Sequence, residues 1–212
     1  FPTRRSSDLG ESNYIQAVKI NVPYQQLYST VSNMMPLSEK QWQAFSEAFI
    51  YREVPKRHLL TAVGSIAREA YFINKGAGRL YFIKDGEEIS ANFMFEGGFI
   101  TSLESFLLQI PSRQAVETLE DSELLVLSKE RLDALVAQQP TFNLFNKAIA
   151  EMAFVMLQRR ASSFILDSPE ERYNNMLVQR PEILSRVPQH MIASYLGVTP
   201  VSLSRIRKRV SG

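Results

Sequence analysis

The residues best suited to chemistry in this chain lie in the stretch GVTPVSLSRIRKRV at positions 197–210. Apolar residues recur there at Leu203, Ile206 and Val210, which is the spacing of one buried helix face. The same helix would turn Arg205 and the cations after it toward solvent. A helix with exposed Arg and small polar residues can enter the major groove of DNA, where Arg reads guanine and other cations meet phosphates. The predicted contact residues are Thr199, Pro200, Val201, Ser202, Ser204, Arg205, Lys208 and Arg209.

The residues before this helix fit the turn of a helix-turn-helix. Gly197 can adopt positive φ in the turn, and Ala193 is small where the second helix would cross the first. Thr199 is a suitable N-cap, and Pro200 is a suitable first helical residue. A generic helical hairpin would need the apolar positions but not an outward Arg205 and a basic trailing end. The expected core contacts are Ile192, Leu196, Val198, Leu203 and Ile206.

Enzymatic and metal chemistry find little support in the 212 residues. The chain has no cysteine and only two histidines, His58 and His190, which are far apart. Iron–sulfur clusters and thiolate catalysis therefore lack their ligands, and a zinc or non-haem iron site lacks imidazoles. A metal-dependent cupin enzyme would need more histidines than the one that the β-rich region offers. No P-loop or G-x-S-x-G motif is present, so we expect neither an enzyme nor a cofactor.

Positive charge gathers at the C-terminal end. Residues 159–212 hold nine Lys/Arg and four Asp/Glu, whereas residues 1–158 hold fifteen and eighteen, for a total of +2. An anionic partner such as DNA fits that end, although a merely solvated basic face is the simpler alternative. No run approaches the roughly eighteen apolar residues that a membrane helix needs, so a cytoplasmic protein is expected.

Before the C-terminal motif, the predicted secondary structure changes from helical to β-rich and back to helical. Short helices are predicted at residues 24–33 and 38–49, the second with a Ser38–Gln41 capping box. Residues 50–127 are rich in β-branched and aromatic residues cut by turn signals, including an Asp85-Gly86 hairpin turn, which indicates a sandwich or barrel. Helical periodicity returns after Ser128, a suitable N-cap.

The N-terminal segment stands apart. FPTRRSSDL at residues 1–9 corresponds to a translated sequencing-adapter sequence. We therefore expect residues 1–22 to be non-native or disordered and to take no part in the fold.

The longest predicted helix occupies residues 139–167. Its apolar residues Phe142, Phe145, Ile149, Met152 and Met156 step by three and four, as in the seam of a two-stranded coiled coil. A single buried helix face would explain this spacing too. Because the helix is also apolar beside this seam, we predict a homodimer. The predicted interface is Phe145, Ile149, Met152 and Met156.

The chain resembles the Crp/Fnr family of transcriptional regulators over roughly residues 24–210. The resemblance rests on YFINKGAGRLYFIKDGEE, on FEGGFITSLESFLLQIPSRQAVETLEDSELLVLS and on LGVTPVSLSRIRKR. It implies an α+β protein with a cyclic-nucleotide-binding-like, cupin-like double-stranded β-helix domain at 23–138, a dimerisation helix at 139–167 and a winged helix-turn-helix domain at 168–212. It further implies a dimer on a palindromic operator, with RNA polymerase as a candidate partner.

Relatives that bind cyclic nucleotides hold the phosphate with backbone N–H groups and one Arg, while a Glu accepts from the ribose. Here Arg113 matches that Arg, but Ser102 stands at the Glu position and Gln114 replaces the following Ser or Thr. Arg113 pairing with a nearby acid is the structural alternative. The candidate effector pocket is Gly97, Ser102, Leu103, Arg113, Gln114 and Met156.

Met156 and Leu157 cannot hydrogen-bond a purine as the matching positions of such relatives do. We therefore expect no cyclic AMP in the usual mode, and the sequence leaves the effector open. A second functional reading is a cyclic-nucleotide or other small-ligand sensor that acts through protein partners.

Overall fold

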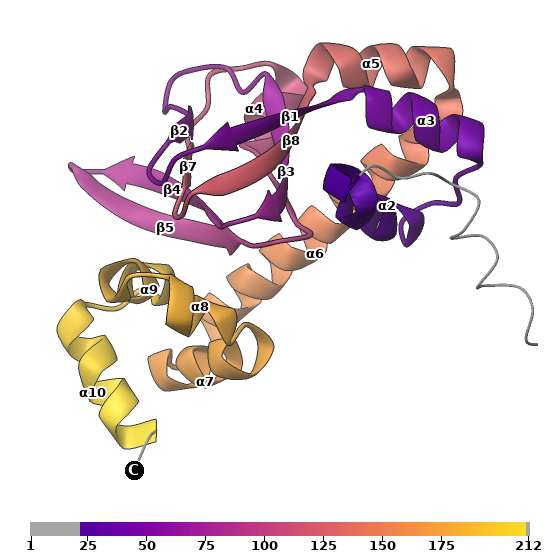
Figure 1. Ribbon diagram of the computed structural model, residues 1–212. Helices are drawn as coiled ribbons and strands as arrows, with labels where there is room; N and C mark the ends of the chain where they lie inside the picture. The colour runs from indigo at the N-terminus through magenta and orange to yellow at the C-terminus, as the bar shows by residue number, and fades with distance from the viewer. Residues whose placement is uncertain (1–21, 211–212) are drawn as a thin grey trace, which may run out of the picture.

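The computed structural model describes residues 22–210, so the expectation for residues 1–22 lies, apart from Val22, outside the described part. A β-rich lobe and a smaller helical lobe are joined by one long helix (Figure 1). The chain enters the first lobe through η1 (Val22–Tyr24), α2 (Gln25–Ser32) and α3 (Glu39–Glu47). The capping box predicted at Ser38 and Gln41 is present, with each residue accepting the backbone N–H of the other.

Two four-stranded antiparallel sheets form the β lobe, a β-roll of the double-stranded β-helix type that the family resemblance implied. One sheet has the order β1-β8-β3-β6 and the other β2-β7-β4-β5. The strands are β1 (Phe49–Val54), β2 (Leu59–Thr61), β3 (Glu69–Lys75), β4 (Gly78–Lys84), β5 (Glu87–Met94), β6 (Phe99–Ile100), β7 (Ala115–Thr118) and β8 (Ser122–Ser128). The short α4 (Leu103–Leu108) lies between β6 and β7.

Turn chemistry shapes this lobe as predicted. Lys84 pairs with Glu87, and Asp85 and Gly86 between them have φ values of 53° and 81°, which confirms the two-residue hairpin. Gly76, before β4, has a φ of 103°. A Cβ at Gly76 would lie 2.2 Å from Ser122 Oγ and 3.0 Å from the Asp121 carbonyl oxygen, so this turn needs glycine for space as well as for φ.

Apolar side chains fill the space between the two sheets. They are Val54, Tyr71, Ile73, Ile100, Val116, Leu124 and Val126. Arg79 is also buried, and its Nε lies 2.9 Å from Glu117 Oε1 while its guanidinium also pairs with Glu88. A buried guanidinium needs such partners, because an unpaired charge in the interior is costly.

The long helix begins inside the β lobe. Ser128 caps α5 (Lys129–Gln138), as predicted, and η2 (Pro140–Phe142) leads into α6 (Asn143–Leu166). Phe145 is 4% exposed, and its ring lies 5.1 Å from that of Phe45 and 5.3 Å from that of Phe99 between centroids. Ile149, one turn on, packs against the same cluster. Phe145 is therefore used within the chain and Ile149 is partly used there, while the predicted dimer interface of Phe145, Ile149, Met152 and Met156 stays a prediction.

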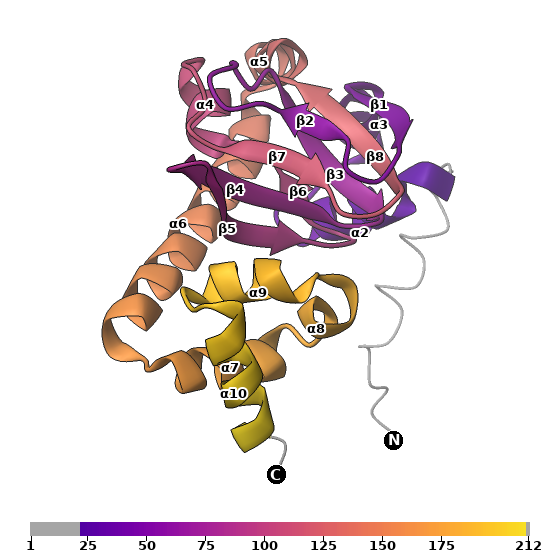
Figure 2. The same cartoon turned by 90° about the vertical axis from the view of Figure 1, so that its left-hand side faces the viewer.

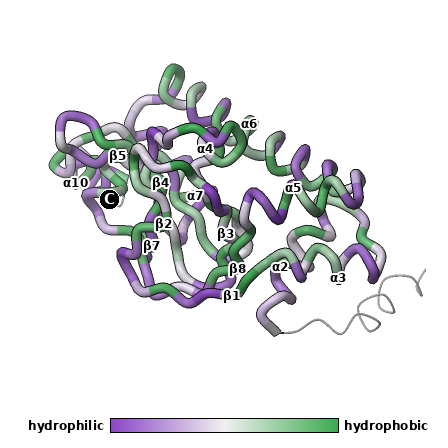
Figure 3. The backbone as a smooth tube through the Cα atoms, turned by 90° about the horizontal axis from the view of Figure 1, so that it is seen from above, coloured by the Kyte–Doolittle hydropathy of each residue, from purple (hydrophilic) through white to green (hydrophobic). Residues whose placement is uncertain are grey.

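Farther along α6 the apolar residues are exposed. Met152 is 58% exposed, and Met156 turns toward β5, where its Sδ accepts a hydrogen bond from Asn92 at 3.3 Å. Hydrophobic segments alternate with hydrophilic ones along this helix in Figure 3. The exposed apolar residues are Leu144, Met152, Phe154, Val155, Met156, Leu157, Phe164, Ile165 and Leu166.

The helical lobe consists of α7 (Pro169–Gln179), α8 (Glu182–Arg186), α9 (Gln189–Leu196) and α10 (Pro200–Val210). Ser168 and Glu171 form the capping box at its start. Every element between residues 169 and 210 is a helix, so the wing implied by the family resemblance is not among the described elements. Within residues 22–210, no helix is both long and apolar enough to span a bilayer.

Two glycine substitutions test the account of the turns. Gly76→Ala is expected to lower the free energy of unfolding by about 3 kcal/mol or more, because it adds a clash with the Asp121 backbone to an unfavourable φ. The matched control is Gly86→Ala, whose Cβ would meet nothing within 4 Å and which should cost only about 1–2 kcal/mol. Urea unfolding of the two variants makes the comparison, and equal losses would contradict the proposed clash.

Candidate nucleic-acid interface

The turn between α9 and α10 has the predicted conformation. Gly197 ends α9 with φ 69° and ψ 35°, and the Val198 N–H donates to the Ala193 carbonyl oxygen at 3.0 Å, as in a Schellman motif. A Cβ at Gly197 would lie 2.7 Å from Cε1 of Phe164 on α6. Glycine is thus required both by the backbone conformation and by the ring that packs against it.

The start and the buried face of α10 also agree with the sequence. Thr199 Oγ1 accepts the Ser202 N–H at 3.2 Å, and Pro200 is the first helical residue. Of the predicted core residues, Ile192, Leu196, Leu203 and Ile206 are buried, while Val198 is partly buried against them. Ala193 is fully buried, as the crossing of two helices requires. These contacts fix which side of α10 faces solvent.

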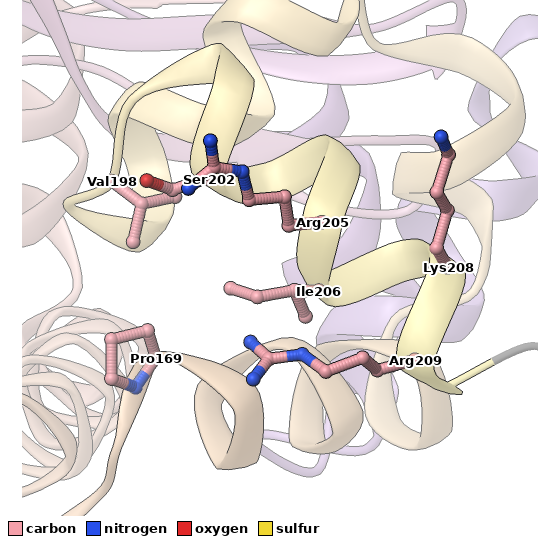
Figure 4. Close-up of a pocket in the computed structure, with 7 residues that line it drawn as sticks. All are labelled: Pro169, Val198, Ser202, Arg205, Ile206, Lys208 and Arg209. Carbon is pink, nitrogen blue, oxygen red and sulfur yellow. The ribbon is translucent and has the colours of Figure 1, made fainter.

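That solvent face carries the candidate contact residues. Val201 is 62% exposed, and Arg205 and Lys208 are exposed and form no ion pair with another residue of the described part. Figure 4 shows Arg205 extending beside Ser202 and Lys208 extending from a later turn of the same helix. The groove has a volume of about 620 Å³ and is lined by Pro169, Val198, Ser202, Arg205, Ile206, Lys208 and Arg209.

The remaining contact candidates differ in how freely they face solvent. Arg209 lies against α7, where its Nη2 is 3.3 Å from Glu170 Oε2 in an exposed pair that stabilises little. Thr199 and Ser204 are exposed, but the Thr199 hydroxyl also donates to Ser202 Oγ at 3.0 Å. Arg207, which was not among the candidates, is exposed as well. The outward face is therefore cationic along its second half.

Much of the C-terminal positive charge is used inside the chain. Arg160 donates to the carbonyl oxygens of Ser90 and Tyr195, and Arg172 donates to the Asp167 and Leu196 carbonyl oxygens. Arg180 and Arg186 bind groups of the β lobe. Counting charges along the sequence did not reveal this division, because their partners are distant in the sequence. The cations left for an anionic partner lie mainly on α10.

The ion pairs between Arg186 and the β lobe shift the pKa values of the groups that form them. Its guanidinium lies 2.6 Å from Glu96 Oε2 and 2.7 Å from Glu120 Oε2. Hydrogen bonds from Arg186 lower the pKa of Glu96 to about 2, although partial burial opposes this shift. The same bonds raise the pKa of Arg186. Both groups are therefore charged at neutral pH.

The predicted effector-pocket residues do not all meet. Ser102 and Ser112 are buried with their Oγ atoms 2.7 Å apart, and Ser112 Oγ accepts the Gln114 N–H at 3.1 Å. Leu103 begins α4 next to Ser102. Arg113 is exposed, and no ion pair within residues 22–210 involves it, so the expected acidic partner is not found there.

The other two pocket candidates lie elsewhere. The Gly97 carbonyl oxygen accepts from Thr30 Oγ1 of α2 at 3.3 Å, and Met156 contacts Asn92 on β5. Among residues 22–210 there is also no group of three His, Asp or Glu side chains that could hold a metal ion.

Comparison with known proteins places this architecture. Residues 51–139 match the family described as the cyclic nucleotide-binding domain, and solved structures match both lobes. The chain has the fold of the Crp/Fnr regulators. One match is a putative transcriptional regulator of the Crp/Fnr family from Eubacterium rectale, with 18% identity, a TM-score of 0.64 and coverage of 84% of this chain and 88% of that one.

Two further solved structures share the Crp/Fnr fold. The c-di-GMP responsive global regulator CLP from Xanthomonas campestris has 20% identity and a TM-score of 0.66, with coverage of 82% of this chain and 92% of that chain. The Thermus thermophilus catabolite activator protein has 20% identity and a TM-score of 0.54, with coverage of 88% and 87%. A search of curated protein sequences gives no match.

The arrangement around Ser102 leads to a ligand prediction. Calorimetric titration with cyclic AMP should show no binding at physiological concentrations, because Ser102 is bonded to Ser112 and Met156 faces β5. Each lost hydrogen bond to a buried ligand group should cost about 1–3 kcal/mol. Micromolar affinity that Arg113→Ala abolishes would refute this account of the cassette.

Proposed function

We propose that this protein is a sequence-specific DNA-binding transcriptional regulator of the Crp/Fnr type. The observation that carries the proposal is α10, whose apolar side is buried while Val201, Arg205 and Lys208 face solvent from a well-formed helix-turn-helix. Such a helix fits the major groove, with its first residues at base edges and its later cations at phosphates. The regulator would act in the cytoplasm, without cyclic AMP in the usual mode.

A homodimer would present two such helices to a palindromic operator. A face of α6 beside the one that packs on the β lobe carries Leu144, Ala148, Met152, Val155 and Leu166, which lie within about 80° of one another around the helix. Leu144, Met152, Val155 and Leu166 are exposed apolar side chains. Pairing this face with its copy would remove them from water and form a helical seam. We propose this seam in place of the predicted interface of Phe145, Ile149, Met152 and Met156, of which it keeps Met152.

Two-fold symmetry then sets the form of the operator. Half-sites related by a dyad and about one helical turn apart, roughly 34–36 Å, would meet the two α10 helices. RNA polymerase is a candidate partner at such promoters.

Arg205 is expected to read a base. It follows Val201 by about one turn and can form a bidentate contact with guanine O6 and N7, while the Val201 methyls would meet a thymine methyl. Arg205→Ala should weaken binding to an in-vitro selected duplex by about 1–3 kcal/mol and relax the preference at one G·C pair. The measurement is a binding series over single-base operator variants.

Lys208→Ala and Arg209→Ala are the matched controls for Arg205→Ala. Each should weaken all operator variants alike and lower the salt slope by about one, as loss of a phosphate contact does. If Arg205→Ala also lowers affinity equally for every variant, Arg205 contacts phosphate, and base reading must come from Val201, Ser202 or DNA shape.

Val155→Lys tests the dimer. Val155 is 42% exposed on α6, so the lysine should leave the fold intact but oppose its copy in the seam. We expect the dimer dissociation constant to rise by at least about a hundredfold, since the charge would be buried against a like charge. Size-exclusion chromatography with light scattering measures this change. Val63→Lys, at a position that is 43% exposed in the β lobe, is the matched control.

An unchanged dimer for Val155→Lys would exclude this face of α6 from the interface. If Val155→Lys and Val63→Lys raise the dimer dissociation constant equally, the added charge has a general effect and the result gives no support to the proposed seam.

A further inference from the structure

The helical lobe is docked on the outer face of β5 and shares an apolar core with the β lobe. Phe93 of β5, together with Ala77 and Leu119, lies in one buried cluster with Ile192 and Ala193 of α9. Both views of the molecule show α9 lying along β5 (Figures 1 and 2). The two lobes therefore have one continuous core between them, in addition to the covalent link through α6.

Two arginines of the helical lobe bind the β lobe at the edge of this core: Arg180, which donates to Asn92 Oδ1 at 3.0 Å and to the Phe93 carbonyl oxygen, and Arg186, which makes more bonds. Arg186, the last residue of α8, donates to both Glu96 carboxylate oxygens at 2.6 and 2.8 Å and to both Glu120 oxygens at 3.0 and 2.7 Å. It also donates to the Gly76 carbonyl oxygen at 3.0 Å, and its guanidinium lies 4.9 Å from the Phe95 ring centroid. The Arg186 side chain is 25% exposed, so water screens these bonds only in part. We call Arg186, Glu96 and Glu120 the Arg186 clamp.

Further bonds fix α9 itself on β5. Ser194 Oγ accepts the Ser90 N–H at 2.9 Å, and it donates to the Glu88 carbonyl oxygen at 3.2 Å. Arg160 of α6 donates to the Ser90 carbonyl oxygen at 3.3 Å and to the Tyr195 carbonyl oxygen at 3.0 Å. The last turn of the first helix of the helix-turn-helix is thus bonded to one strand, directly through Ser194 and through Arg160 at Tyr195.

The helical lobe contacts the β lobe through a different side from the one that exposes the outward face of α10. The clamp and the α9 bonds come from α8 and α9, whereas Val201, Arg205 and Lys208 on α10 remain exposed. The orientation of α10 is consequently fixed relative to the β lobe without its outward face being covered.

We propose that Arg186 is a positioning residue, which by joining Glu96 and Glu120 holds α10 at a fixed angle and so sets the half-site spacing that the dimer reads. This inference rests on the proposed function. In a two-fold dimer, any rotation of the helical lobe on its β lobe moves both α10 helices and changes their separation. The chain's own residues would then hold the helix-turn-helix in place without an effector.

Thiol labelling tests the clamp without DNA. The chain has no cysteine, so Ser90→Cys introduces a single thiol at a fully buried position bonded to α9. Its reaction with a thiol reagent reports how often the lobes separate. Adding Arg186→Gln should speed labelling about tenfold, and Arg186→Lys should give an intermediate rate.

Two controls separate lobe opening from unfolding. A thiol from Ser105→Cys lies buried in the β lobe away from α9, and its labelling rate should not change with Arg186→Gln. Lys75→Gln removes one charge from an exposed pair with Glu123 and should change neither rate. Faster labelling at both thiols would mean that the variant merely unfolds, which overturns the positioning role.

DNA binding provides the second readout. The probe is the duplex selected in vitro with the full wild-type chain, rebuilt with its half-sites moved apart or together by one and two base pairs. Wild type should prefer one spacing, whereas Arg186→Gln should bind that spacing about tenfold more weakly and the neighbouring spacings nearly as well. Lys75→Gln should keep the wild-type preference.

An unchanged spacing preference, or tighter binding by Arg186→Gln, would overturn the proposal; the second result would mean that the clamp restrains α10 from DNA. If wild type binds no duplex, the proposed function fails and the spacing role fails with it. The labelling rates would then still show whether the clamp closes, so the two failures are distinguishable.

Discussion

The aromatic cluster at the start of α6 is the contact on which the arrangement of this molecule depends. Phe142 and Phe145 pack against Phe45, with ring centroids 5.6 and 5.1 Å apart, and Phe99 of β6 closes the cluster from the β lobe. Burying several aromatic rings together is a large stabilising contribution for one helix end. Because a helix is rigid, anchoring its first turns also decides which side of its distant half faces outward.

The local features of the fold were predicted from the sequence, whereas the contacts between distant segments were not. The turn at Gly197, the cap at Thr199 and the buried face of α10 were all predicted, since each depends on residues within a few positions. The hairpin at Asp85 and Gly86 and the caps at Ser38 and Ser128 were predicted for the same reason. Local rules of turns and caps do not depend on what lies across the molecule.

Long-range contacts could not be predicted in this way. The three-four spacing through Phe145 and Ile149 describes a buried helix face, but it does not say whether the chain itself or a second copy covers that face. In the same way, Arg186 counted as one positive charge of a basic segment, whereas its partners Glu96 and Glu120 are 90 and 66 positions away. The candidate pocket shows the same limit, because the family resemblance that suggested Gly97 and Ser102 could not show that Gly97 accepts a hydrogen bond from Thr30 of α2.

The core shared by Phe93 and the helices of the smaller lobe has a consequence for folding. If that lobe were cut free near Ser168, it would lose Ala77, Phe93 and Leu119 from its apolar cluster and leave Ile192 without its cover. The two lobes should therefore melt together in a single cooperative transition, and the smaller one should complete its folding only after the β-roll has formed its outer surface. The protein thus has two lobes in its architecture but only one cooperative folding unit.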